Sequence, residues 1–198
     1  MKKIILAVFL LVCCARAGHA TVLTFEGLPA QQIATEYGGL VWNNMVAVNT
    51  TSLSFPSGLN KGRVSGDYVA FNYRSLEASV SMAEGAFDFY GVFLTAVWNN
   101  NLSIDVQGWR NGSRVYDTVV TVGADAPSYF DFNYQDIDAV TFKSYGGVRA
   151  NYIGSGTQFA MDNFAFKPVP EPGTMALLGL GVACLAVYGK RRTYRTEV

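Results

Sequence analysis

Histidine and cysteine are both missing from residues 21–167, the long middle part of this 198-residue chain. The single histidine is His19, and the three cysteines are Cys13, Cys14 and Cys184. Without cysteine, the middle part can form neither a disulfide framework nor a thiolate metal site. Without histidine, it lacks the commonest general base, so a serine nucleophile activated by histidine is excluded there.

Basic residues are also scarce in this part, which contains 8 Lys and Arg against 13 Asp and Glu, a net charge of −5. A domain of this charge repels nucleic-acid phosphates, and no run of basic residues interrupts the repulsion. No spacing singles out a pair of carboxylates for glycoside hydrolysis. We therefore expect no nucleic-acid partner and no enzymatic activity. The alternative is a secreted glycan hydrolase that uses Asp or Glu.

The first 20 residues have the pattern of a secretory signal peptide. Two lysines precede an unbroken apolar run from Ile4 to Cys14, and the small residues Ala17 and Ala20 follow as cleavage positions. A buried helix is the alternative, but an apolar run directly after two lysines favours a signal. A lipoprotein is disfavoured because Val12 stands where a small residue should precede the lipidated cysteine.

Three features follow one another at the C-terminal end. They are the tripeptide Pro170, Glu171 and Pro172, the uncharged apolar run from Met175 to Tyr188, and the basic cluster Lys190, Arg191 and Arg192. As a helix the apolar run would be about 21 Å long, shorter than a hydrocarbon core of about 30 Å. A span this short suits a temporary anchor. The basic cluster places the tail in the cytoplasm and the domain outside.

This order of features resembles the PEP-CTERM sorting signal of Gram-negative bacteria that make extracellular polysaccharide. The resemblance covers residues 168–192, with a short transmembrane helix at 174–189, and leaves 193–198 as a cytoplasmic end. It implies that an exosortase, a membrane-embedded cysteine protease, recognises and removes the tail. The precursor would lie in the inner membrane, and the processed protein at the cell surface or in the extracellular matrix. An ordinary tail anchor after a proline-rich linker is the alternative.

Residues 21–167 are predicted to form one all-β domain, an antiparallel β-sandwich of jelly-roll type. Short apolar and aromatic runs recur between Gly, Asn, Asp and Ser clusters, and no window has a convincing helical period. About ten strands fit this length. Residues 102–106 alternate apolar with polar side chains, Asn111-Gly112 is a hairpin signal, and the asparagines at 99–101 are expected to form a turn.

The apolar positions change parity at Gly91 and again at Asp162–Asn163, which predicts a β-bulge at each place. The second bulge bears on a candidate metal site. An early Phe-Glu-Gly segment with Glu26 and a late Met-Asp-Asn-Phe segment with Asp162 resemble the ends of MAM-like and carbohydrate-binding jelly rolls. The resemblance implies neighbouring first and last strands and a structural Ca²⁺, for which backbone carbonyls would supply further ligands. Alternatively, both carboxylates are solvated strand-end residues that bond backbone amides.

The aromatic residues suggest a surface on which sugar rings stack. Trp109 lies at the end of a predicted strand, directly before the Arg110-Asn111-Gly112 turn, and is the candidate ligand-binding residue. A core or rim position is the alternative for Trp109. Trp98 shares its parity with apolar positions and is expected in the core. The predicted function is that of a non-catalytic, exported surface or matrix protein, with extracellular polysaccharide as its candidate partner.

Overall fold

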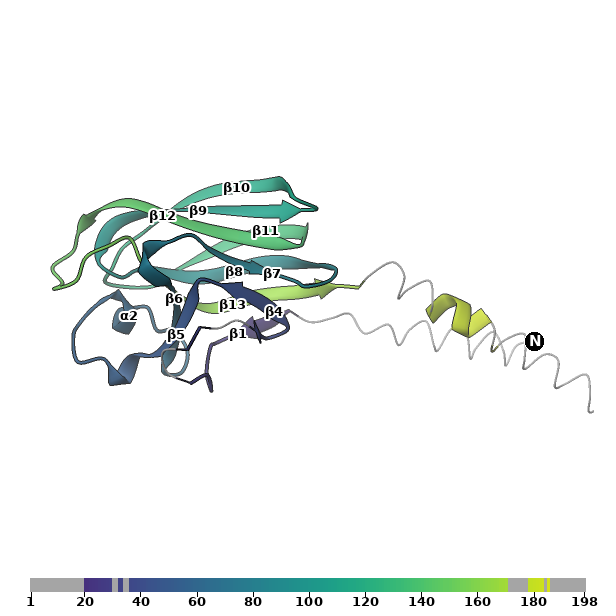
Figure 1. Ribbon diagram of the computed structural model, residues 1–198, viewed down its shortest axis with the longest axis horizontal. Helices are drawn as coiled ribbons and strands as arrows, with labels where there is room; N and C mark the ends of the chain where they lie inside the picture. The colour runs from purple at the N-terminus through teal and green to yellow at the C-terminus, as the bar shows by residue number, and fades with distance from the viewer. Residues whose placement is uncertain (1–19, 30–31, 34–35, 171–177, 184, 186–198) are drawn as a thin grey trace, which may run out of the picture. The chain divides into compact units, whose positions relative to one another are not determined.

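The computed structural model describes residues 20–29, 32–33, 36–170, 178–183 and 185 (Figure 1). The unit Ala20–Val169 contains every described strand. In the second unit, residues 178–183 and 185 are helical, within the range predicted for the short C-terminal helix. No helix among the described residues combines the length and the apolar character needed to cross a bilayer. The predicted signal peptide lies almost entirely outside the described residues.

The β unit is a sandwich of two antiparallel sheets, which confirms the predicted fold class (Figure 1). The seven-stranded sheet has the order β11 (Ser128–Ile137), β8 (Ala86–Ala96), β13 (Phe159–Val169), β6 (Tyr68–Asn72), β5 (Met45–Asn49) and β2 (Gln32–Ile33), with β1 (Thr21–Leu23) also paired to β13. The six-stranded sheet has the order β10 (Ser113–Val122), β9 (Asn99–Arg110), β12 (Ala139–Arg149), β7 (Ala78–Ser81), β4 (Leu40–Asn43) and β3 (Glu36–Tyr37). Consecutive strands repeatedly change sheet, as in jelly rolls.

Three single-turn helices interrupt the strands: η1 (Thr50–Ser52), α2 (Gly58–Lys61) and η2 (Tyr73–Ser75). The Asn111-Gly112 hairpin is confirmed, because both residues have positive φ and join β9 to β10. The expected turn at 99–101 is wrong. The chain reverses at Val97–Trp98 instead, and Asn99 pairs with Arg149 as the first residue of β9.

Aromatic rings fill the space between the sheets. Phe89 is at the centre, with its ring centroid 4.7 Å from that of Phe164, 5.2 Å from Phe132 and 6.2 Å from Phe142. Both Phe89 and Phe164 are fully buried, and they come from the neighbouring strands β8 and β13. Such ring pairs add to the free energy of burial, and Phe142 of β12 joins the six-stranded sheet to this cluster.

Both predicted bulges are confirmed in the pairing of β13 with β8. Asp162 pairs with Phe93 and Ala165 with Gly91, so β13 has one residue too many between these positions, and Asn163 has a φ of +54°. On its other side, β13 pairs first with β6, as far as Met161, and then with β1, from Phe164. The first and last strands are therefore neighbours, and Asp162 lies where one partner strand ends and the other begins.

Replacing Phe164 by alanine removes the ring that stacks on Phe89 and leaves a cavity between the sheets. We expect this change to lower the free energy of unfolding by about 3–5 kcal/mol. Urea denaturation followed by circular dichroism measures it. Val148→Ala is the control, because Val148 is 68% exposed and should change stability by less than about 0.5 kcal/mol. Equal effects of the two substitutions would contradict this assignment of the core.

Candidate functional site

The side chain of Asp162, in β13, forms hydrogen bonds with the loop that leads into β6. This loop, residues 63–67, is called the entry loop. Its Oδ2 accepts hydrogen bonds from the backbone N–H of Val64 at 2.7 Å and of Ser65 at 2.8 Å. Its Oδ1 accepts from the N–H of Asn163 at 2.7 Å and from the Ser65 hydroxyl at 3.2 Å. Asp162 is completely buried, so these bonds replace the water that the carboxylate loses on folding.

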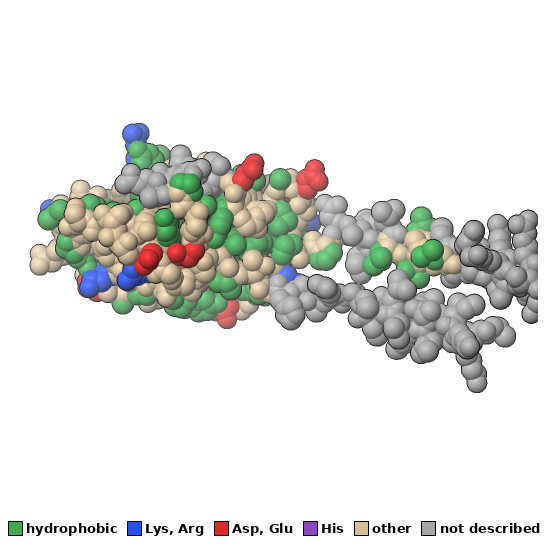
Figure 2. Space-filling view, turned by 90° about the horizontal axis from the view of Figure 1, so that it is seen from below, with side chains coloured by type: hydrophobic (Ala, Val, Ile, Leu, Met, Phe, Trp, Pro, Cys, Tyr) green, Lys and Arg blue, Asp and Glu red, His purple; other side chains and the backbone are tan. Residues whose placement is uncertain are grey.

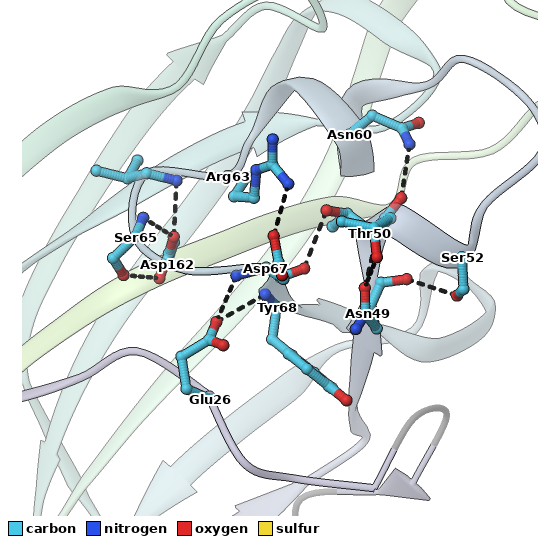
Figure 3. Close-up of polar contacts among 12 residues, drawn as sticks. Glu26, Asn49, Thr50, Ser52, Asn60, Arg63, Ser65, Asp67, Tyr68 and Asp162 are labelled. Atoms are coloured by element: carbon cyan, nitrogen blue, oxygen red, sulfur yellow. Dashed lines mark hydrogen bonds and ion pairs between the residues drawn. The ribbon is translucent and has the colours of Figure 1, made fainter.

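Glu26 holds the other end of the same loop, as Figure 3 shows. Its Oε1 accepts hydrogen bonds from the N–H of Asp67 at 2.8 Å and of Tyr68 at 2.7 Å. The carbonyl of Asp67 in turn accepts from the N–H of Thr50 at 2.9 Å. Two carboxylates, one just after β1 and one in β13, thus fix the entry loop through its backbone.

Burial raises the pKa of the Asp162 carboxyl above its ordinary value, while the hydrogen bonds from Ser65, Val64 and Asn163 act in the opposite direction. Every hydrogen bond described for Glu26 and Asp162 comes from an N–H or O–H donor, and a cation in their place would face the positive ends of those donors. Among the described residues, no three His, Cys, Asp or Glu side chains group as metal ligands. This geometry favours backbone anchoring over the expected Ca²⁺ site. It also corrects the solvated position assumed in that alternative, because Asp162 is buried.

Trp109 lies near the end of β9 on the outer face of the six-stranded sheet. Leu102, Ile104 and Val106 point into the core, so the alternate positions of β9, including Gln107 and Trp109, face outward. Trp109 is half-buried, and its Nε1–H donates to the Thr141 hydroxyl of β12 at 3.2 Å. The hydrogen bond fixes the orientation of the indole, and Trp109 still reaches solvent, so it does not lie in the core.

Polar side chains continue this outer face across the sheet. Thr141 pairs with Gln107 on one side and with Ser79 of β7 on the other, and Ser79 pairs with Asn43 of β4. Paired residues share a face, so amide and hydroxyl groups follow one another across four strands. Farther along β12, Tyr145 has the same outward parity and is 47% exposed.

One carboxyl on this face is electrostatically unusual. Burial, and next the charge of Asp117 on β10, raise the pKa of the Asp105 carboxyl above its ordinary value. Gln107 donates to Asp105 Oδ2 at 2.8 Å, and Asp117 pairs with Arg114 at 2.8 Å. Asp105 Oδ2 and Asp117 therefore have partners, whereas Asp105 Oδ1 is buried without one among the described residues.

Trp98 does not lie in the main core, which corrects the sequence expectation. It lies at the bend after β8, half-buried, and stacks on Phe55 with ring centroids 6.0 Å apart. It belongs to a second, smaller apolar cluster that contains Val48, Leu59, Val69, Val97 and Ala160. A cleft of about 550 Å³ opens beside this cluster. Sequence parity pointed to a buried position but could not show which side of the sheet buries it.

The architecture defines a β-sandwich domain that ends directly in a C-terminal targeting segment. Residues 168–192 match the model of the PEP-CTERM protein-sorting motif, so this chain carries that motif and is an exported protein. The motif residues Glu171, Pro172 and those of the basic cluster 190–192 lie outside the described residues. No curated protein sequence matches the chain.

Several solved structures resemble the domain at low identity. The xylan-binding domain from CBM 22 is 14% identical over 77% of this chain and 96% of its own, with a TM-score of 0.42. The K1 cleaved adhesin domain of Lys-gingipain from Porphyromonas gingivalis W83 is 8% identical over 77% and 100%, with a TM-score of 0.41. CBM51 from Clostridium perfringens GH95, in complex with methyl-galactose, is 13% identical over 74% and 100%, with a TM-score of 0.36. At these values the likeness says nothing about a ligand of this chain.

Replacing Asp162 by asparagine turns an amide N–H₂ toward the N–H groups of the entry loop. We expect the free energy of unfolding to fall by about 1–3 kcal/mol, because at least one buried donor loses its acceptor. Glu26→Gln should act in the same direction and less strongly, since Glu26 is less buried. Glu84→Gln is the matched control, because Glu84 is exposed and makes none of the described hydrogen bonds.

Thermal melts of the parent in chelator and in millimolar Ca²⁺ complete this test. We expect identical curves, since the carboxylates already accept hydrogen bonds. A melting temperature that rises with Ca²⁺ in the parent and not in Asp162→Asn would restore the expected cation site.

Proposed function

We propose that this chain is an exported, non-catalytic protein that an exosortase-type protease processes at its C-terminal motif and that binds extracellular polysaccharide. The binding surface is the outer face of the six-stranded sheet around Trp109. The observation that carries the proposal is the position of this oriented, partly exposed indole beside a row of amide and hydroxyl groups. Aromatic rings bind the apolar faces of sugar rings, and such polar groups exchange hydrogen bonds with sugar hydroxyls.

The extent of this surface favours a polymer over a single sugar. Trp109 pairs with Ala139, and Tyr145 lies six residues farther along β12. At ~3.4 Å per residue the two aromatic positions are roughly 20 Å apart along the strands. The outward residues between them on β9 and β12 are polar or charged: Ser103, Asp105, Gln107, Thr141 and Lys143. An extended glycan chain can contact both aromatic residues and the polar groups between them, whereas a compact ligand cannot.

Charge gives a weaker argument in the same direction. On the proposed surface, Asp105 of β9 and Lys143 of β12 are paired residues of opposite charge. The face seen from below in Figure 2 shows only small, separate groups of basic and of acidic side chains. A neutral or weakly acidic polysaccharide needs no patch of one charge sign, whereas nucleic acid does. The alternative of a glycan hydrolase needs two carboxylates with separated roles. We treat Asp105, whose Oδ2 accepts from Gln107, and Asp117, which pairs with Arg114, as part of the polar surface and not as a catalytic pair.

The sorting part of the proposal is tested by replacing Pro170, Glu171 and Pro172 with alanine in a host that has an exosortase. We expect the variant to stay in the membrane fraction as precursor, because the motif that the protease reads is gone. Intact mass and immunoblotting of membrane and culture fractions measure the result. Native mature protein that still contains residues 190–192, or a variant processed normally, would contradict the proposal.

The binding part is tested by Trp109→Ala in affinity electrophoresis with the polysaccharide of the host. We expect retardation to weaken by about tenfold or more, since truncating a central aromatic contact costs more than about 1.4 kcal/mol. Trp109→Phe should retain most of the binding. Tyr129→Ala is the control, because Tyr129 is 49% exposed but lies on β11 of the other sheet.

Unchanged retardation in Trp109→Ala, or equal loss in Tyr129→Ala, would contradict this surface as the binding site. Release of reducing sugar by the parent protein would favour the hydrolase instead.

A further inference from the structure

The cleft of about 550 Å³ lies on the outer side of the seven-stranded sheet, where the proposed polysaccharide surface has no part. In β6, Ala70 belongs to the main core, while its neighbours Val69 and Phe71 belong to the second cluster. In β13, Met161 belongs to the main core and Ala160 to the second cluster. Since successive side chains of a strand point to opposite faces, the second cluster and its cleft lie outside the sandwich.

The walls of the cleft are held in place by a cross-linked cover segment, residues 49–62. Ser57 and Asn60 form a capping box on α2, and the Asn60 amide also donates to the Thr50 carbonyl at 3.0 Å. The N–H of Gly58 donates to the Val97 carbonyl at 2.9 Å, and a Cβ at Gly58 would overlap the Ala96 carbonyl. The cover is therefore pinned to the end of β8, and the opening beside it belongs to the fold.

The lining is almost entirely apolar and carries no charge. Its aromatic members are Phe55, Phe71, Tyr73 and Trp98, with aliphatic side chains such as Leu53 between them. The one amide in the lining is that of Gln158. Among the described residues, no Asp, Glu, Lys or Arg lines the cleft. Beside the cleft, the guanidinium of Arg74 lies 5.1 Å from the ring centroid of the lining residue Tyr73.

The two polar groups of the lining are the Gln158 amide and the Tyr73 hydroxyl, and neither has a hydrogen-bond partner among the described residues. No hydrogen bond is described for the Gln158 side chain, and its Oε1 is buried without a partner. The Tyr73 hydroxyl has no described partner either, although the Tyr73 backbone is bonded to Asn44. An amide and a phenol can each donate and accept, so both fit a hydroxyl group. Pockets of this size with an apolar lining and few polar groups suit small organic molecules.

We propose that this cleft binds a neutral, mainly apolar small molecule that carries a hydroxyl group, such as an alkyl alcohol. The apolar body lies against Phe55, Phe71 and Trp98, and the hydroxyl bonds to Gln158 or Tyr73. An inorganic ion finds no ligating charge there. A pyranose would leave most of its hydroxyls against apolar side chains, and each unpaired polar group costs free energy. This site is independent of the proposed polysaccharide surface.

The test compares two isomers, 1-octanol and 1-methoxyheptane, of which only the alcohol can donate a hydrogen bond. The full chain, in detergent at one fixed concentration, is titrated with each compound, and the indole N–H signals are followed by NMR. Trp98→Phe assigns the Trp98 signal. We expect 1-octanol to shift the Trp98 signal and to leave those of Trp42 and Trp109 in place. The ether should bind about three- to tenfold more weakly, as for one lost hydrogen bond.

Two variants and one charged probe sharpen the test. Gln158→Met keeps the length of the side chain but removes the amide, so it should reduce the difference between alcohol and ether. Leu53→Phe should narrow the cleft and weaken the binding of both compounds, whereas the control Val148→Phe should leave their binding unchanged. The proposal is overturned by an unmoved Trp98 signal, by equal affinity for the two isomers in the parent, or by tighter binding of octanoate than of 1-octanol.

Discussion

The carboxylate of Asp162 lies where β13 changes its neighbouring strand along the edge opposite β8. β6 pairs with β13 as far as Met161, and β1 begins to pair at Phe164. On that side the backbone at Asp162 and Asn163 therefore has no partner strand, and the chain there forms a bulge in which Asn163 has a positive φ. There the entry loop provides the N–H groups of Val64 and Ser65. A buried carboxylate without hydrogen bonds is costly in free energy, so detaching the entry loop from Asp162 is strongly unfavourable.

Of the two candidate surfaces, only the cleft depends on this arrangement. The entry loop connects the cover segment 49–62 to β6, so Glu26 and Asp162 fix one end of the segment that walls the cleft. The other end follows β5 directly. The face around Trp109 is made of long paired strands, with one irregularity in β10 opposite Trp109, and needs no such anchor. The domain thus has one surface formed by sheet geometry alone and one formed by a loop that two carboxylates hold.

The sequence predicts those features whose cause is local. The Asn111-Gly112 hairpin follows from the backbone preference of two residues, and both bulges follow from a change of parity in the apolar positions. The same reasoning fails at 99–101, because three asparagines also suit a strand when Asn99 and Asn100 pair with β12. The parity of apolar positions also cannot place Trp98. It indicates that the side chain is buried, but not whether it lies between the two sheets or on the outer side of one of them. The partners of Glu26 and Asp162 lie between 41 and 98 residues away in sequence, apart from Asn163, and no local pattern contains them.

The distance between the domain and the sorting motif follows from the register of β13. Pro168 pairs with Phe87 and Val169 with Ala86, so the last strand runs into the matched region 168–192 by two residues. Beyond Phe166, β13 has lost the pairing with β1 and is bonded only to β8. Proline has no N–H to donate, and Pro168 stands where only one neighbour remains, which is the position that a sheet tolerates. β13 ends at Val169, directly before Pro170. The folded domain and the matched motif therefore share residues 168 and 169.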